Sequence, residues 1–258
     1  MSDPDAVILQ ERHGEHVLVL TINRFRRRNS FDYDTAVALE EALDAFDAEA
    51  DLHIAVLTGA GGVFSAGQDL IAAKEGSLAI APRRGGFGIM AVPPNKPVIA
   101  AVEGHALAGG LELALSCDLI VSSETATMGL PEATWSLVAA GGGLFRLPKR
   151  IPYHVAMELA LTGTPRPATY FHGLGLVNRL CAPGDALATA LGLADEVLRC
   201  GPLAVAASAQ IVRQAFDWTE EEAWAAQQPY VDAVLASEDR LEGLTAFAEK
   251  RSPTWKNR

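Results

Sequence analysis

The sequence has few cysteines and few basic residues, and each shortage excludes a class of protein. Cys117, Cys181 and Cys200 are far apart and form no C-x-x-C pair, which argues against a disulfide framework or a zinc site and favours reduced thiols in a cytosolic protein. With 21 Lys and Arg against 32 Asp and Glu, the net charge is −11. A general nucleic-acid binder needs the opposite balance, although a few local cations can still hold an anionic small ligand.

Long apolar runs and a basic leader are also missing. No apolar run reaches the roughly 18 residues that a membrane-spanning helix needs. Residues 1–5 carry acids where a signal or transit peptide would carry cations. We therefore expect a cytoplasmic protein without a membrane span.

The apolar residues that are present fall in short runs that predict an α/β core. Continuous apolar runs of strand length alternate with segments of helical periodicity, as in a sheet covered by helices on both sides. The stretch 70–94 shows little periodicity, and we expect a partly mobile functional loop there. The predicted core elements are a hairpin over 7–22, strands over 54–59, 97–102 and 119–122, and helices over 34–50 and 107–116.

Only helical patterns remain after Pro183. Residues 186–199, 203–216, 220–237 and 238–250 are successive helical segments. We therefore divide the chain into an α/β core, residues 1–195, that would carry the active site, and a helical C-terminal part, residues 196–258.

Two segments rich in small residues lie where a strand is expected to run into a helix. They are residues 64–70 (FSAGQDL) and residues 104–114 (GHALAGGLELA). Backbone N–H groups at such a turn can be left free, and two that converge on one carbonyl oxygen form an oxyanion hole. The start of a helix adds a dipole that favours negative charge at that oxygen.

Two glutamates accompany these turns. Glu112 lies near the start of the predicted helix over 107–116 among apolar neighbours, and Glu132 follows Pro131 after a further strand. Burial and mutual repulsion push the pKa values of two such carboxyl groups apart, so that one can act as an acid and the other as a base. A surface position for Glu112, or a place in the first turn of a helix for Glu132, would explain each residue without catalysis.

In their order and spacing, these motifs resemble the crotonase, or enoyl-CoA hydratase/isomerase, superfamily. The resemblance covers almost the whole chain. It is carried by residues 21–24 with 29–31, 64–70, 96–104, 108–114, 117–118, 130–132, 158–163, 173–177 and 247–251.

The resemblance implies an α/β fold of repeated ββα units with a helical C-terminal region for assembly into a homotrimer or a dimer of trimers. It implies an acyl-CoA thioester as substrate, no metal, and no cofactor beyond the CoA that the substrate carries. The N–H groups of Ala66 and Gly109 would hold the thioester carbonyl oxygen. Glu112 and Glu132 match the two acids of the hydratases, so the expected reaction is hydration of a 2-enoyl-CoA, with Glu112 activating water and Glu132 serving C2.

Further substrate contacts are expected beside these motifs. Asp69 would either bind substrate or cap the helix that follows it. Arg24, which precedes the arginine run 26–28, and Lys250, reaching across a subunit interface, are candidates for the phosphates of CoA; a solvated face is the alternative interpretation. The expected substrate-binding residues that flank the oxyanion hole are Gly67, Gln68, Leu70 and Gly110.

One loop departs from the family pattern. Ser136, Ala139 and Ala140 occupy positions where the family often has glycine, proline and glycine, and three glycines follow. Because this loop borders the acyl pocket in relatives, the alternatives are another reaction of the superfamily, such as double-bond isomerisation or carnitinyl-CoA dehydration, or a catalytically silent CoA-binding member. A serine hydrolase and a dinucleotide oxidoreductase are disfavoured, because the sequence lacks G-x-S-x-G around Ser65 and G-x-G-x-x-G after residue 58.

Overall fold

A six-stranded sheet forms the centre of the fold in the computed structural model, which describes residues 5–258. The strand order is β1-β2-β3-β6-β8-β11, with β1 antiparallel to β2 and the other neighbours parallel. The predicted hairpin and the three predicted buried strands are confirmed. The strands are β1 (Ile8–His13), β2 (Val17–Ile22), β3 (Ile54–Gly59), β6 (Val98–Val102), β8 (Leu119–Ser123) and β11 (Arg179–Cys181).

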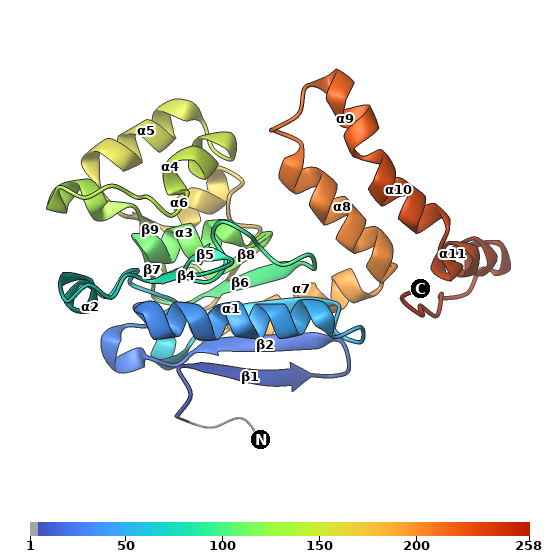
Figure 1. Ribbon diagram of the computed structural model, residues 1–258, viewed down its shortest axis with the longest axis horizontal. Helices are drawn as coiled ribbons and strands as arrows, with labels where there is room; N and C mark the ends of the chain where they lie inside the picture. Colours follow the sequence, from blue (N-terminus) through green and yellow to red (C-terminus); the bar gives the residue numbers. More distant parts are fainter. Residues whose placement is uncertain (1–4) are drawn as a thin grey trace.

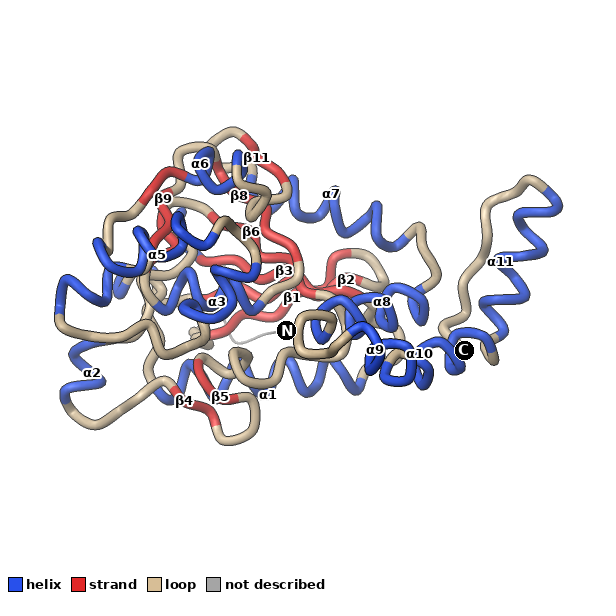
Figure 2. Tube along the Cα trace, turned by 90° about the horizontal axis from the view of Figure 1, so that it is seen from above, coloured by secondary structure: helices blue, strands red, loops and turns tan. Residues whose placement is uncertain are grey.

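Helices cover both faces of this sheet, as Figure 2 shows with α1 (Tyr33–Ala48) on one side and α7 (Ala186–Leu198) on the other. Successive side chains of a strand point to opposite faces. In β3, Leu57 therefore packs in the apolar cluster that includes Phe46 of α1, whereas Val56 packs in the cluster that includes Ala190 of α7. Burial on both faces explains why the strands are continuous apolar runs.

A second, smaller sheet positions the two glutamates. Its order is β10 (Arg166–Pro167), β9 (Thr127–Gly129) and β7 (His105–Leu107). Strand β7 runs parallel to β9, with Leu107 opposite Gly129. Strand β7 leads into α3 (Gly109–Ser116), which carries Glu112, and β9 leads into the 3-10 helix η3 (Pro131–Trp135), which carries Glu132. Since parallel strands end at the same edge, both glutamates emerge at one edge of this sheet.

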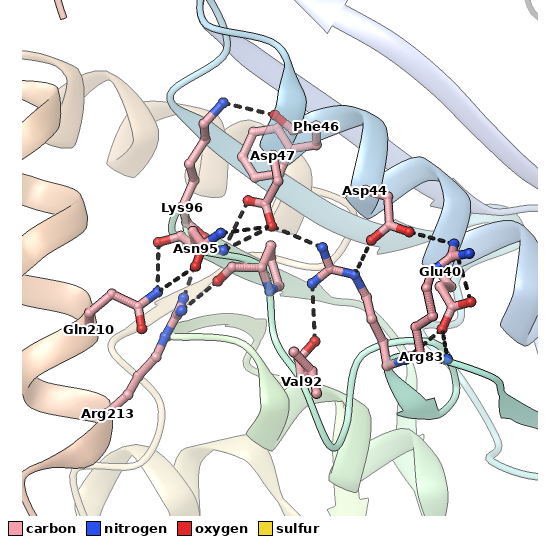
Figure 3. Close-up of polar contacts among 12 residues, drawn as sticks. Glu40, Asp44, Phe46, Asp47, Arg83, Val92, Asn95, Lys96, Gln210 and Arg213 are labelled. Carbon is pink, nitrogen blue, oxygen red and sulfur yellow. Dashed lines mark hydrogen bonds and ion pairs between the residues drawn. The ribbon is translucent and has the colours of Figure 1, made fainter. Parts of the chain in front are cut away.

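Regular structure and polar anchors replace the irregular loop predicted over 70–94. The segment contains α2 (Leu70–Lys74), β4 (Ile80–Ala81) and β5 (Gly85–Gly86). The segment is anchored to α1 through Glu40, Asp44 and Asp47, which Figure 3 labels. The buried Arg84 guanidinium donates to Asp44 (2.7 Å) and Asp47 (2.9 Å). Glu40 accepts from the backbone N–H groups of Arg83 and Arg84 at 2.7 and 2.5 Å. These partners lie far apart in the sequence, so periodicity within the segment could not reveal them.

The C-terminal helices α8 to α11 extend away from the core (Figure 1). The predicted helix over 220–237 is divided into two where Pro229, at the start of α10, lacks an N–H donor. The predicted boundary at residue 195 falls inside α7, whose Leu193, Ala194 and Val197 still pack against the sheet, so the C-terminal part begins after α7. The helices are α8 (Pro202–Gln214), α9 (Glu220–Ala226), α10 (Gln228–Leu235) and α11 (Glu238–Glu249).

The remaining elements connect these layers. None of the helices within residues 5–258 is long and apolar enough to cross a membrane. The connecting elements are η1 (Phe25–Arg27), η2 (Ala60–Gly62), α4 (Gly143–Arg146), η4 (Leu147–Lys149), α5 (Tyr153–Thr162), β10 (Arg166–Pro167) and α6 (Ala168–Gly173).

A charged clamp joins α8 to the core. Arg213 donates through Nε and Nη2 to the two carboxylate oxygens of Asp118, both at 2.6 Å, and Asp118 also accepts from the N–H of Val98 at 2.8 Å. Further donors of Arg213 reach the carbonyl oxygens of Pro94 and Lys96. The side chains of Arg213 and Asp118 are 20% and 17% exposed, so the pair is largely shielded from water.

Replacing Asp118 with alanine is expected to lower the free energy of unfolding by about 3 kcal/mol, because the Arg213 charge loses its partner in a shielded site. Urea unfolding would measure the change. The matched control is Asp217→Ala, which removes the exposed pair with Lys149 and should cost less than about 1 kcal/mol. Equal losses in the two variants would contradict the clamp.

Candidate active site

A cavity of about 670 Å³ lies where the two glycine-rich turns meet η3. Phe87 and Met90 from the β5 region and Trp135 from η3 give it an apolar wall. The predicted site residues that line it are Ala66, Gln68, Leu70, Gly109, Glu112 and Glu132. The structure therefore brings both turns and both glutamates to one space.

Glycine is required where the two turns touch. Gly67 has φ +94°, and a Cβ built on it would lie 2.9 Å from the backbone nitrogen of Gly109. A Cβ on Gly110 would lie 2.1 Å from the carbonyl oxygen of Ser65. Any side chain at either position would push the turns apart. Gly67 and Gly110 thus set the spacing of the site, although neither lines the cavity.

One of the two free backbone donors differs from the expected pair of Ala66 and Gly109. The N–H of Ala66 donates to the carbonyl oxygen of Arg28 at 3.0 Å, so the prediction that Ala66 supplies an oxyanion donor is wrong for this structure. The N–H of Asp69 is likewise taken by Phe31. Across residues 5–258, no hydrogen bond uses the N–H of Gln68, between these two, or that of Gly109 at the start of α3. Sequence alone missed Gln68 because the choice of donor depends on pairing with the distant segment 28–31.

Asp69 and Arg24 have structural roles. The Asp69 carboxylate caps α2 by accepting from two of its backbone N–H groups at 3.1 and 3.2 Å, which confirms the capping alternative. Arg24 forms ion pairs with Asp32 (2.5 Å) and Asp69 (3.4 Å) and donates to the carbonyl oxygen of Ser30. Neither Asp69 nor Arg24 lines the cavity. Both residues therefore support the turn, and their expected contacts with substrate stay predictions.

Two other expected substrate contacts lie at the edge of the site or beyond it. Leu70 stands at the cavity with 57% of its surface exposed. Lys250 is an exposed residue at the end of α11, which in Figure 1 lies on the opposite side of the molecule from α2. A contact between Lys250 and substrate bound to another copy stays a prediction.

Glu112 is a buried carboxyl group with stabilising partners. It is 4% exposed, and its Oε1 accepts from the N–H of Gly143 at 2.9 Å. Burial raises the pKa of Glu112, while hydrogen bonds from Gly143 and Gly141 and the positive charge of Arg146 oppose the rise. The ionised form of Glu112 is therefore stabilised by two backbone N–H donors and a nearby cation.

Glu132 has less support. Burial and the nearby Glu112 carboxyl together raise the pKa of Glu132 to about 7, and only its own backbone N–H opposes the rise. Its Oε2 is buried and has no hydrogen-bond partner among the described residues. Of the two carboxyl groups, Glu132 is the one that keeps its proton to higher pH, so the pair can divide base and acid roles.

The loop that departs from the family pattern borders this pair. Leu137 and Val138 line the main cavity, and together with Glu132 they also line a second, apolar cavity of about 340 Å³ against α4 and α5. A Cβ on Gly141 would lie 2.7 Å from Oε2 of Glu112, and one on Gly143 would lie 3.1 Å from its Cγ. The glycine run Gly141–Gly143 thus lets the loop approach Glu112. The sequence alone did not indicate this contact.

Comparison with known proteins identifies the family. A sequence model described as Enoyl-CoA hydratase/isomerase matches residues 12–258. The chain belongs to this family. The enoyl-CoA hydratase EchA19 of Mycobacterium tuberculosis is 39% identical over 264 residues, which cover 100% of this chain and 98% of that protein. A carnitinyl-CoA dehydratase of Salmonella arizonae is 41% identical over 248 residues, which cover 93% of this chain and 95% of the relative.

Solved structures of the family superpose closely. An enoyl-CoA hydratase from Mycobacterium tuberculosis H37Rv matches with a TM-score of 0.94 at 46% identity, covering 98% of this chain and 99% of that one. A carnitinyl-CoA hydratase from Mycobacterium avium matches with a TM-score of 0.77 at 37% identity, with 98% and 99% coverage. The crotonase-type α/β fold with a helical C-terminal region, expected from the resemblance, is confirmed.

Replacing Glu132 with glutamine is expected to stabilise the protein in a pH-dependent way. Since the folded-state pKa is raised from 4.5 to about 7, the stability that Glu132 contributes is complete below about pH 4.5 and is lost as the pH rises through 7. The variant should therefore equal wild type near pH 4.5 and exceed it at pH 8. After allowance for partial exposure, a gain of about 1 kcal/mol would raise Tm by about 2–4 °C.

Scanning calorimetry at the two pH values would measure this gain. Glu41→Gln, at an exposed position of α1, is the matched control and should leave Tm unchanged. A Tm of Glu132→Gln below that of wild type at pH 8 would show that the carboxylate is supported and would contradict the argument.

Proposed function

We propose that this chain is an enoyl-CoA hydratase that adds water across the 2,3 double bond of a 2-enoyl-CoA thioester. The observation that carries the proposal is the pair of unlike carboxyl groups in one cavity. Glu112 has two backbone N–H donors from the glycine loop and a cation that favour its ionised form, whereas Glu132 has only its own backbone N–H and stays protonated to higher pH. A hydration needs one group that accepts a proton from water and one that delivers a proton to carbon.

The free N–H groups of Gln68 and Gly109 would bind the thioester carbonyl oxygen. Their hydrogen bonds draw electron density from the double bond and make C3 electrophilic. Charge then develops on the oxygen, where each donor of this kind typically contributes about 2.7–4 kcal/mol to transition-state stabilisation. The start of α3 at Gly109 adds a favourable dipole.

The two glutamates would complete the addition. Glu112 accepts a proton from water as the water oxygen bonds to C3, and the electron pair of the double bond moves towards the thioester oxygen. Glu132 gives its proton to C2 as this enolate collapses. The product is a 3-hydroxyacyl-CoA, and exchange of protons with solvent restores both glutamates. The scheme uses no cofactor beyond the CoA of the substrate.

The lining of the cavity favours a hydrocarbon acyl group. Apart from Glu112, Glu132 and Gln68, its side chains are apolar or aromatic, or are absent at glycine. The carnitinyl group carries a trimethylammonium charge, and the lining offers it no carboxylate besides the two proposed to act in catalysis. The resemblance to carnitinyl-CoA dehydratases nevertheless makes carnitinyl-CoA the substrate to test beside straight-chain, branched and aromatic 2-enoyl thioesters.

We further propose that the chain works as a homotrimer or a dimer of trimers in the cytoplasm. The C-terminal part, from α8 onward, exposes large apolar side chains that assembly would cover: Val212, Phe216, Trp224, Leu235, Leu241, Leu244 and Phe247. The three free cysteines fit a reducing compartment.

Glu112→Gln and Glu132→Gln are each expected to lower kcat for hydration by about 10²–10⁴-fold, because each removes one proton transfer. The fall in enoyl absorbance with a short 2-enoyl-CoA would measure kcat, and titration calorimetry should show retained binding of the thioester. Glu41→Gln serves again as the exposed control. A wild type that binds CoA thioesters but hydrates none of them would refute the proposal, and a shift of the double bond in a 3-enoyl substrate without hydration would replace it with isomerisation.

The pH profile of kcat is expected to distinguish the two roles. If Glu132 donates the proton, kcat falls as the pH rises through about 7, because the acid form is lost there. The rise at lower pH would report ionisation of Glu112. Stopped-flow rates between about pH 5 and pH 9 would measure both limbs, and an increase in kcat through pH 7 would reverse the assignment.

A further inference from the structure

Arg146, the last residue of α4, connects three segments around Glu112. Its Nη1 donates to the carbonyl oxygen of Gly141 at 3.1 Å and to Oγ of Ser116 at 3.3 Å, and its Nη2 donates to the carbonyl oxygen of Met90. Met90 and Gly141 line the cavity, whereas Arg146 itself does not. The guanidinium thus lies behind the wall of the site.

Each acceptor leads directly to Glu112. Oγ of Ser116 donates to the backbone carbonyl oxygen of Glu112 at 2.8 Å. A Cβ on Gly141 would lie 2.5 Å from the sulfur of Met90 and 2.7 Å from Oε2 of Glu112, so both side chains lie against Gly141. Displacement of the Arg146 guanidinium would therefore release both the helix and the loop that enclose the carboxylate.

The glycine run closes around the guanidinium as well. A Cβ on Gly142, where φ is +106°, would lie 2.3 Å from Nη1 of Arg146. The next residue, Gly143, donates its N–H to Glu112. One side of the run therefore fits the carboxylate and the other fits the arginine, which accounts for three glycines in succession.

The charges around Glu112 come from several elements. Burial raises the pKa of Glu112, and the charge of Arg146 on α4 opposes this rise. Burial also raises the pKa of Glu132 on η3, and the nearby Glu112 carboxyl adds to that rise. Cys117 at the end of α3 is a buried thiol whose pKa burial raises, so it is neutral. Burial lowers the pKa of Arg146, and the charge of Arg150 lowers it as well, whereas Glu112 opposes this shift.

We propose that Arg146 is a positioning residue for hydration, which holds the Gly141–Gly143 run and the end of α3 so that Glu112 faces the water it activates. This inference rests on the proposed function, because it takes Glu112 as the base. Arg146 touches no substrate and takes part in no proton transfer. Its effect reaches the reaction through the geometry and the ionisation of Glu112.

Two substitutions separate geometry from charge. Arg146→Gln removes both the positive charge and the fork of donors that holds the loop and α3. We therefore expect kcat to fall about 10²-fold, as a displaced catalytic group typically causes, with KM nearly unchanged. The low-pH limb of kcat should also move to higher pH, because loss of the cation raises the pKa of Glu112. Arg146→Lys keeps the charge without the fork of donors, so kcat should fall while the limb stays in place.

Arg150→Gln is the matched control. Arg150 lies four residues further on and donates to the carbonyl oxygen of Leu115 at 2.7 Å, so its loss also weakens contacts to α3. It should lower Tm without moving the low-pH limb. A shift of that limb as large as in Arg146→Gln, or wild-type kcat and pH profile in either Arg146 variant, would overturn the inference.

A direct titration of Glu112 separates this inference from the proposed function. Carbon-13 NMR of the Glu112 carboxyl group, in the Glu132→Gln background, follows its ionisation whether or not water is added to any substrate. A higher pKa in Arg146→Gln than in Arg146→Lys supports the inference even if wild type is inactive as a hydratase. Equal pKa values in the two variants overturn it even if wild type is active. Folding of each variant is checked by circular dichroism, and if Arg146→Gln does not fold, the decrease of kcat in Arg146→Lys decides the outcome.

Discussion

The parallel pairing of β7 with β9 is the constraint on which the site depends. Because Leu107 lies opposite Gly129, the two strands end at the same edge, and the residues that follow each strand begin their helices side by side. One helix brings Glu112 and the free Gly109 donor, and the other brings Glu132. The six-stranded sheet and its helical layers serve to support this short pair, whose few backbone hydrogen bonds could not hold it alone.

Unlike surroundings turn two identical side chains into different chemical groups. Burial raises the pKa of both glutamates, but Glu112 has two N–H donors from the glycine loop and a cation that oppose the rise, whereas Glu132 has only its own backbone N–H. Burial of the Glu132 carboxyl group lowers the stability of the fold, and the same burial raises its pKa so that it can act as the acid. Such a loss of stability is expected where function conflicts with stability. Arg146 and the glycine run maintain this difference from behind the cavity wall.

The sequence predicted the features that depend on local pattern. Apolar runs predicted the strands of the large sheet, and small residues predicted the turns at 64–70 and 108–110. It could not predict which N–H stays free, because Ala66 is occupied by Arg28, about 40 residues earlier. The same limit applies to Arg24, whose partners come from two separate segments, and to Arg146, whose role depends on contacts with Met90 and Ser116. Such contacts are fixed by tertiary packing and leave no periodic signal.

The glycine run at 141–143 has a consequence for how the family can diversify. A side chain added at any of these three positions would meet Glu112, Met90 or Arg146 and would have to displace it. Leu137 and Val138, a few residues earlier, are 48% and 70% exposed and border both cavities. New acyl preferences can therefore arise by exchange at Leu137 and Val138 while the catalytic geometry is inherited unchanged, which makes this short stretch the natural target for a directed-evolution library.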